Sequence, residues 1–153
     1  MHMSSLAREW SADEVRALPE DGNRYEVVDG ELLVTPAPAL IHQRAVRGLL
    51  GPLDAYVTRQ GLGEVVFSPA DVAYGPRTMV QPDLFVVPHV GGVAPRRWDE
   101  LGPLLLVIEI LSPSTARRDR FTKRRLYQRE GIPEYWIVDL DARAGCRAGR
   151  DAT

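Results

Sequence analysis

The sequence predicts one domain of the α/β (α+β) class, in which a mixed β-sheet is flanked by helices. Short strand patterns alternate with helical patterns along the chain, as in sheets packed by helices. The run at 104–112 is apolar almost throughout, which is typical of a central strand covered on both faces. The chain has 153 residues, 44% of them hydrophobic, enough for one sizeable core. We therefore expect a single domain over 1–153, with its core at about 11–140.

The N-terminal part predicts a short helix followed by a β-hairpin. "SADE" at 11–14 is a capping box, and the helix that it opens should end before Pro19. Two short apolar runs, at 24–28 and 31–35, then flank an Asp-Gly pair. This arrangement is a strong hairpin signal.

The middle of the chain predicts one long helix and several strands. From Leu40 to about Gln60 the apolar residues fall at helical spacing, with an irregularity expected at Gly51-Pro52. Alternating or apolar runs after a glycine-rich turn then predict strands at 64–68, 71–75 and 80–88.

The last elements should be a loop, a strand, a helix and a strand. A loop at 91–102 precedes the apolar strand at 104–112. A helix is expected from about 117 to 130, closed by Gly131, before a final strand at 134–140.

Composition excludes several protein classes. No apolar run approaches the roughly 20 residues that span a bilayer, and the N-terminus lacks the apolar core of a signal peptide. Cys146 is the only cysteine, which excludes an internal disulfide and a cysteine metal cluster. We expect a cytoplasmic protein without membrane contact.

Charge is distributed unevenly. The net charge is -2, but residues 116–130 carry seven basic and two acidic side chains, a local excess of +5 that could bind phosphates. Of the 19 basic residues, Lys123 is the only lysine. It is either left by an arginine-rich composition or kept for chemistry that arginine cannot perform. In a helix it could also simply pair with Asp119, four residues earlier.

Acidic residues occupy strand positions that packing alone would not select. Asp83 heads an apolar strand, Glu109 lies inside another, and Glu26 and Glu31 lie on the two arms of the hairpin. Carboxylates of neighbouring strands can converge, and Mg²⁺ takes such oxygen ligands together with water. The alternatives are a strand-start role for Asp83, a buried arginine partner for Glu109 and a solvated Glu31, while Glu26 is ambiguous.

Three segments resemble the Uma2 family of endonucleases, which belongs to the PD-(D/E)xK, restriction-endonuclease-like superfamily. They are "RYEVVDGELLVTPAP" at 24–38, "QPDLFVV" at 81–87 and "LLLVIEILSPSTARRDRFTKRRLYQREGIPEYWIVD" at 104–139. The last block is highly specific, whereas the "PD" dipeptide alone is a weak signal. The resemblance runs from about 24 to 139 and implies a restriction-endonuclease-like fold.

The resemblance also implies a divalent-metal site for Mg²⁺ or Mn²⁺ at Asp83 and Glu109. The general motif places a lysine two residues after the second acid, where this chain has Leu111. The family is similar to nucleases in which the lysine has moved to the following helix, which makes Lys123 the third catalytic candidate. Tyr127, one turn further on, would pack over this lysine or orient it.

Other residues acquire supporting roles from the same resemblance. Glu26 or Glu31 would complete the metal shell, directly or through water. His42 would orient a water or contact phosphate, and Asp119 is a further supporting residue, although a lone helix histidine is more often structural.

The implied activity is Mg²⁺-dependent hydrolysis of phosphodiester bonds in DNA. The DNA backbone would be held by arginines that could equally be solvated charge: Arg44, Arg47, Arg117, Arg118, Arg120 and Arg124. A homodimer would allow both strands to be cut. The alternative is a non-catalytic nucleic-acid-binding or assembly module on the same fold, and a phosphatase is a weaker rival because no histidine cluster accompanies the acids.

The segment at 141–153 departs from the family pattern. The resemblance implies further strands there, but this stretch is rich in Gly, Ala and Arg and has little strand character. We expect an atypical tail, as a truncation or frame shift would leave, and a sheet edge exposed beside it.

Overall fold

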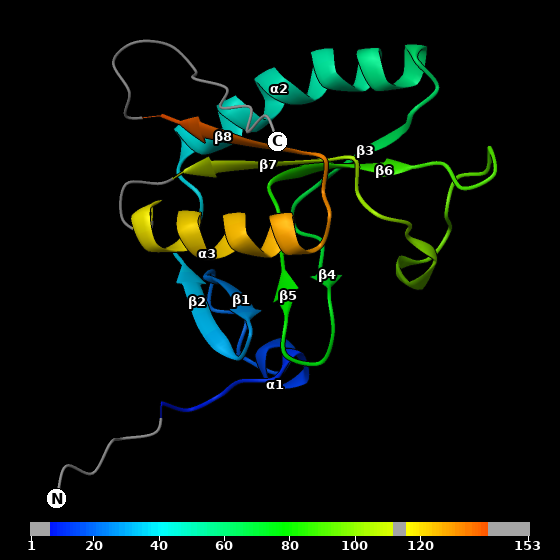
Figure 1. The fold of residues 1–153 in the computed structure, drawn as a ribbon. Helices are drawn as coiled ribbons and strands as arrows, with labels where there is room; N and C mark the ends of the chain where they lie inside the picture. Colours follow the sequence, from blue (N-terminus) through cyan, green and yellow to red (C-terminus); the bar gives the residue numbers. More distant parts are fainter. Residues whose placement is uncertain (1–6, 112–115, 141–153) are drawn as a thin grey trace, which may run out of the picture. The chain divides into compact units, whose positions relative to one another are not determined.

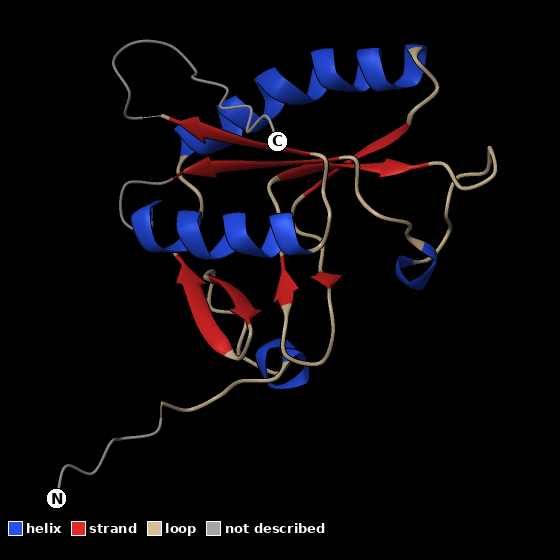
Figure 2. Ribbon diagram, in the orientation of Figure 1, coloured by secondary structure: helices blue, strands red, loops and turns tan. Residues whose placement is uncertain are grey.

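The computed structural model describes residues 7–111 and 116–140, and of residues 116–119 the backbone alone. The chain forms two compact units, Met1–Ala37 with Ala73–Val80 and Pro38–Val72 with Gln81–Thr153. Figures 1 and 2 show their helices and strands, which bear out the predicted α+β class with a mixed sheet and flanking helices. The expectation of one domain over 1–153 stays a prediction.

The first unit is built on the predicted hairpin. Strands β1 (Arg24–Val28) and β2 (Glu31–Thr35) pair antiparallel in full register, because Asp29 and Gly30 adopt the positive φ angles that a tight turn needs. The sheet has the order β2-β1-β5-β4, with β4 at Val72–Ala73 and β5 at Met79–Val80.

Helix α1 (Ala12–Arg16) covers part of this unit. Its Ser11 cap and Glu14 form the predicted capping box. The helix packs its buried side chains against the sheet in an apolar cluster of Ala12, Val15, Val27 and Met79.

The second unit contains a mixed sheet of order β3-β6-β7-β8. Its strands are β3 (Gly63–Phe67), β6 (Leu84–Pro88), β7 (Leu106–Leu111) and β8 (Glu134–Asp139). Neighbouring strands pair antiparallel except β7 and β8, which are parallel. A parallel pair needs a crossover, and helix α3 (Ala116–Arg129) supplies it.

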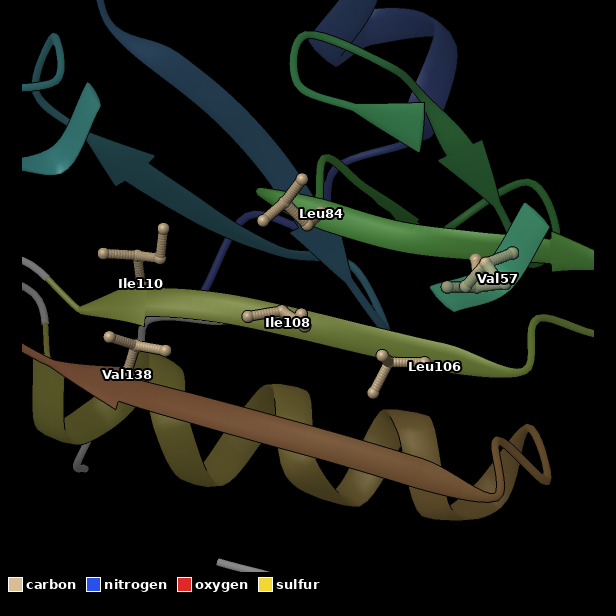
Figure 3. Packing of buried hydrophobic residues seen from close by; sticks show 7 residues of the cluster. Val57, Leu84, Leu106, Ile108, Ile110 and Val138 are labelled. Atoms are coloured by element: carbon tan, nitrogen blue, oxygen red, sulfur yellow. The ribbon is translucent and has the colours of Figure 1, made fainter. Parts of the chain in front are cut away.

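Helices α2 (Leu40–Arg59) and α3 lie on opposite sides of this sheet (Figure 1). The α2 side holds the main apolar core, in which alternate residues of β7 point the same way. Figure 3 shows six members of this core: Val57, Leu84, Leu106, Ile108, Ile110 and Val138. The intervening residues of β7 therefore face α3.

The structure corrects parts of the predicted element pattern. The expected strand at 80–88 is interrupted by Gln81-Pro82-Asp83, and its two pieces, β5 and β6, belong to different sheets. Pro82 cannot donate a ladder hydrogen bond, which fits the interruption. The strand expected at 71–75 shrinks to β4.

Three further points concern the helices and the chain end. α2 continues through Pro52. The predicted loop at 91–102 contains a short 3-10 turn, η1 (Trp98–Glu100). In the part of the chain that the structure describes, no helix combines the length and apolarity needed to cross a membrane. The tail expected at 141–153 lies outside the described residues.

Candidate active site

Two acidic residues lie near the point where β6 begins beside β7. Leu84 pairs with Ile108, so continuing the antiparallel register by one residue places Asp83 opposite Glu109. Directly opposed residues have Cβ atoms about 4.5–5.5 Å apart. Asp83 also reaches across the pair, because its Oδ2 accepts a 2.7 Å hydrogen bond from the Ile110 backbone N–H. Both acids are buried, with Asp83 1% and Glu109 4% exposed.

Helix α3 provides the partners of Glu109. Lys123 Nζ donates to Glu109 Oε1 at 3.0 Å, and Tyr127 OH donates to the same oxygen at 2.7 Å. Lys123 and Tyr127 are four residues apart and so share one face of the helix. Lys123, itself only 4% exposed, is thus a buried cationic partner of Glu109. An arginine partner for Glu109 stays a prediction.

Asp83 is held from the other side of the sheet by α2. His42, near the start of α2, places its Nε2 3.1 Å from Asp83 Oδ1. His42 donates this hydrogen bond from Nε2, because an ionised carboxylate only accepts. The structure thus places His42 on the carboxylate of Asp83. A contact with water or phosphate stays a prediction.

Tyr135 joins this group and was not singled out from the sequence. Its ring lies 5.1 Å from that of Tyr127, centroid to centroid, at 57°. Its hydroxyl oxygen is buried and has no hydrogen-bond partner among the residues that the structure describes. Burial and then the charge of Glu109 raise the pKa of the Tyr135 phenol, so the hydroxyl stays protonated. No sequence signal distinguished it; the structure places it two residues before Ile137, the β8 partner of Glu109.

The structure describes the side chains of only some of the basic residues of α3. Arg120 is exposed and Arg124 is partly buried, and both act electrostatically on the Tyr135 hydroxyl. The side chains of Arg117 and Arg118 lie outside the described residues. So does that of Asp119, and its pairing with Lys123 is therefore untested.

A protein-family comparison identifies the chain. Residues 12–146 match the model of the Uma2 family, described as "Putative restriction endonuclease". The chain belongs to the Uma2 family. The predicted family resemblance is thus confirmed, and membership indicates a nuclease.

A solved structure has a similar fold. It is described as a "putative nuclease belonging to DUF820 from Anabaena variabilis ATCC 29413". This Uma2 chain superposes on it with a TM-score of 0.67 at 21% identity, over 86% of this chain and 75% of that chain. Among curated proteins, none matches the sequence.

The hairpin acids of this Uma2 protein belong to the first unit. Glu26 is fully buried, and its Oε2 lies 3.8 Å from the Nε of Arg24. Glu31 is partly buried rather than solvated. Their participation in a metal shell stays a prediction.

The chemistry of the Asp83 and Glu109 pair fits a hard divalent cation. Within residues 7–111 and 116–140, no group of three or more His, Cys, Asp or Glu side chains could hold a metal ion. Mg²⁺ does not require such a cage, because it often binds one or two carboxylates and keeps several waters. Two buried, adjacent carboxylates in a Uma2 protein supply this type of donor set.

Proposed function

We propose that this Uma2 protein is a divalent-metal-dependent endonuclease that hydrolyses phosphodiester bonds in DNA. The observation that carries the proposal is a group of three buried charged residues: Asp83 directly before β6, Glu109 on the adjacent strand β7, and Lys123 bonded to Glu109. Apolar packing gains nothing from burying such charges. Family membership supports the nuclease class of this function.

Asp83 and Glu109 would hold Mg²⁺ or Mn²⁺. When bound, a divalent ion in this position lowers the pKa of a bound water and stabilises charge on phosphate oxygens. The site residues around the carboxylates keep them in place: His42 holds one oxygen of Asp83, and the Ile110 N–H holds the other.

Lys123 would act on the developing negative charge. Its ammonium is fixed by Glu109 in a buried site, where a charge acts more strongly than it does in water. It would therefore either position the attacking water or stabilise the phosphate as the water adds. Tyr127 shares the same carboxylate oxygen and would keep Glu109 oriented towards the lysine.

The basic side chains of α3 would contact the DNA backbone. Arg120 and Arg124 lie on the helix that carries Lys123, so DNA held there would place a phosphate near the site. Such contacts make affinity fall with salt. A homodimer would let both strands be cut, and Glu26 or Glu31 would add to the metal shell.

The test is cleavage of supercoiled plasmid by the full chain with Mg²⁺ or Mn²⁺ and with EDTA. We expect metal-dependent nicking that falls at least about 100-fold in Asp83→Asn and in Glu109→Gln, because both substitutions remove a carboxylate charge. Glu64→Gln is the matched control, since Glu64 is an exposed carboxylate on β3 of the same sheet.

Two outcomes would contradict the proposal. Equal nicking by the Asp83 variant and the wild type would place the activity elsewhere or in a contaminant. Absence of nicking with either metal, together with a DNA gel shift, would favour the non-catalytic binding module on this fold.

A further inference from the structure

The Tyr135 hydroxyl is a polar group without a hydrogen-bond partner in the described part of the chain. Its oxygen is buried, and no hydrogen-bond partner reaches it among the described residues. Buried polar groups without a partner are uncommon and cost free energy, whereas a phenylalanine here would fill almost the same volume. A bound ligand could supply the hydrogen-bond partner that this hydroxyl lacks among the described residues.

The surroundings of this hydroxyl place it in the proposed active site. Its ring packs against Tyr127, whose own hydroxyl is bonded to Glu109. On β8, Tyr135 lies opposite Val107, two residues before the Ile137 that pairs with Glu109. Alternate residues of a strand share a face, so Tyr135 lies on the same sheet face as Glu109. The residue as a whole is partly exposed, although its hydroxyl oxygen is buried.

The chemistry of the hydroxyl selects the type of ligand. The raised pKa of Tyr135, caused first by its burial, keeps the group neutral and able to donate. An acceptor such as a phosphate oxygen can therefore be its partner. Among the described residues, Arg120 and Arg124 act electrostatically on this hydroxyl, and Glu109, which acts on it with the opposite sign, is paired with Lys123. The two arginines favour an anionic acceptor here.

We propose that Tyr135 is a further substrate-binding residue, whose hydroxyl donates a hydrogen bond to a non-bridging phosphate oxygen of the DNA. This inference rests on the nuclease function proposed above. It gives Tyr135 a role different from that of Tyr127, which binds a carboxylate of the protein itself.

The test compares Tyr135→Phe with Tyr127→Phe, two substitutions that each remove one hydroxyl. Binding of a fluorescently labelled DNA duplex is measured with Ca²⁺ in place of Mg²⁺, and the unfolding midpoint in urea is measured without DNA. We expect Tyr135→Phe to unfold at the wild-type urea concentration or above, and to bind the duplex roughly tenfold more weakly, as for one lost hydrogen bond to a charged acceptor. Tyr127→Phe should unfold at a lower urea concentration, because it loses a bond to Glu109.

Two results would overturn the role of Tyr135 alone. Unchanged DNA affinity in Tyr135→Phe, with a wild-type protein that nicks plasmid, would show that the hydroxyl does not contact the substrate. A lower unfolding midpoint in Tyr135→Phe would show that the hydroxyl already has a partner in the folded protein. A wild type that neither binds nor nicks DNA would overturn the nuclease function and this inference together.

Discussion

At the residue scale, one oxygen atom of Glu109 binds two side chains of α3. Glu109 Oε1 accepts from both Lys123 and Tyr127, and neither side chain of the ion pair is more than 5% exposed. A buried ion pair adds little to stability compared with apolar residues, but removal of one partner leaves a charge without compensation. Removing one member of the pair is therefore expected to lower the free energy of unfolding more than removing both members.

Lys123→Met should lower the free energy of unfolding by about 3–5 kcal/mol, because Glu109 then stays buried without its cation. Urea denaturation measures this loss. The double variant Glu109→Gln/Lys123→Met should recover most of it, since the charge is removed as well. Losses that simply add in the double variant would contradict strong coupling in this pair.

At the element scale, α2 combines an apolar inner face with helix-weakening residues on its surface. Side chains such as Ala45, Leu49 and Leu53 pack on the core, whereas Gly48, Gly51 and Pro52 are exposed. Proline and glycine disfavour a helix interior. Packing against the sheet, rather than helix propensity, therefore holds α2, and with it His42, in place.

Gly51→Ala should stabilise the protein by up to about 1 kcal/mol, because a Cβ at this position meets open space and favours the helix. Gly63→Ala is the matched opposite, since its Cβ would overlap the Val87 carbonyl oxygen across the β3–β6 pair. It should destabilise the protein severely. Thermal or urea unfolding of the two variants checks both signs, and a destabilised Gly51→Ala would refute this account of α2.

At the scale of the whole molecule, the proposed divalent metal ion would bind only the folded chain. Asp83 comes from the turn before β6 and Glu109 from β7, so the donor pair exists only when these strands are paired. A ligand that binds the native state alone raises its stability by mass action. Metal binding should therefore raise the free energy of unfolding even without DNA.

Mn²⁺ at one hundred times its dissociation constant should raise the free energy of unfolding by about 2.7 kcal/mol. Melting curves with and without Mn²⁺ measure the effect, and EDTA should reverse it. Asp83→Asn should abolish the shift and Glu64→Gln should keep it. A shift of the same size in Asp83→Asn would locate the cation outside the proposed site.

Much of this architecture could be predicted from the sequence, because local signals are strong. The Asp-Gly pair predicted the β1–β2 hairpin, and the apolar run at 104–112 predicted that β7 is an inner strand of its sheet. The split around Pro82 was missed, since apolar character alone does not show which sheet a segment joins. The candidate site residues were predicted one by one, but the contacts among them depend on how α3 is rotated against β7, which the sequence does not show.

Tyr135 shows most clearly what a single sequence lacks. A partly buried tyrosine in a final strand is typical of ordinary packing, and nothing in "EYWIVD" distinguishes its hydroxyl. Only the parallel register with β7 and the absence of a bonding partner in the described part make it distinctive. Both features depend on residues distant in sequence.

The alternation along β7 has a consequence for assembly of the sheet. Leu106, Ile108 and Ile110 enter the apolar core, while Glu109 faces the opposite side. Pairing β7 one residue out of register would exchange the two faces, burying the carboxylate among aliphatic side chains and turning an isoleucine towards Lys123. Both changes would cost free energy, so we expect Glu109 to disfavour this misregistered pairing during folding.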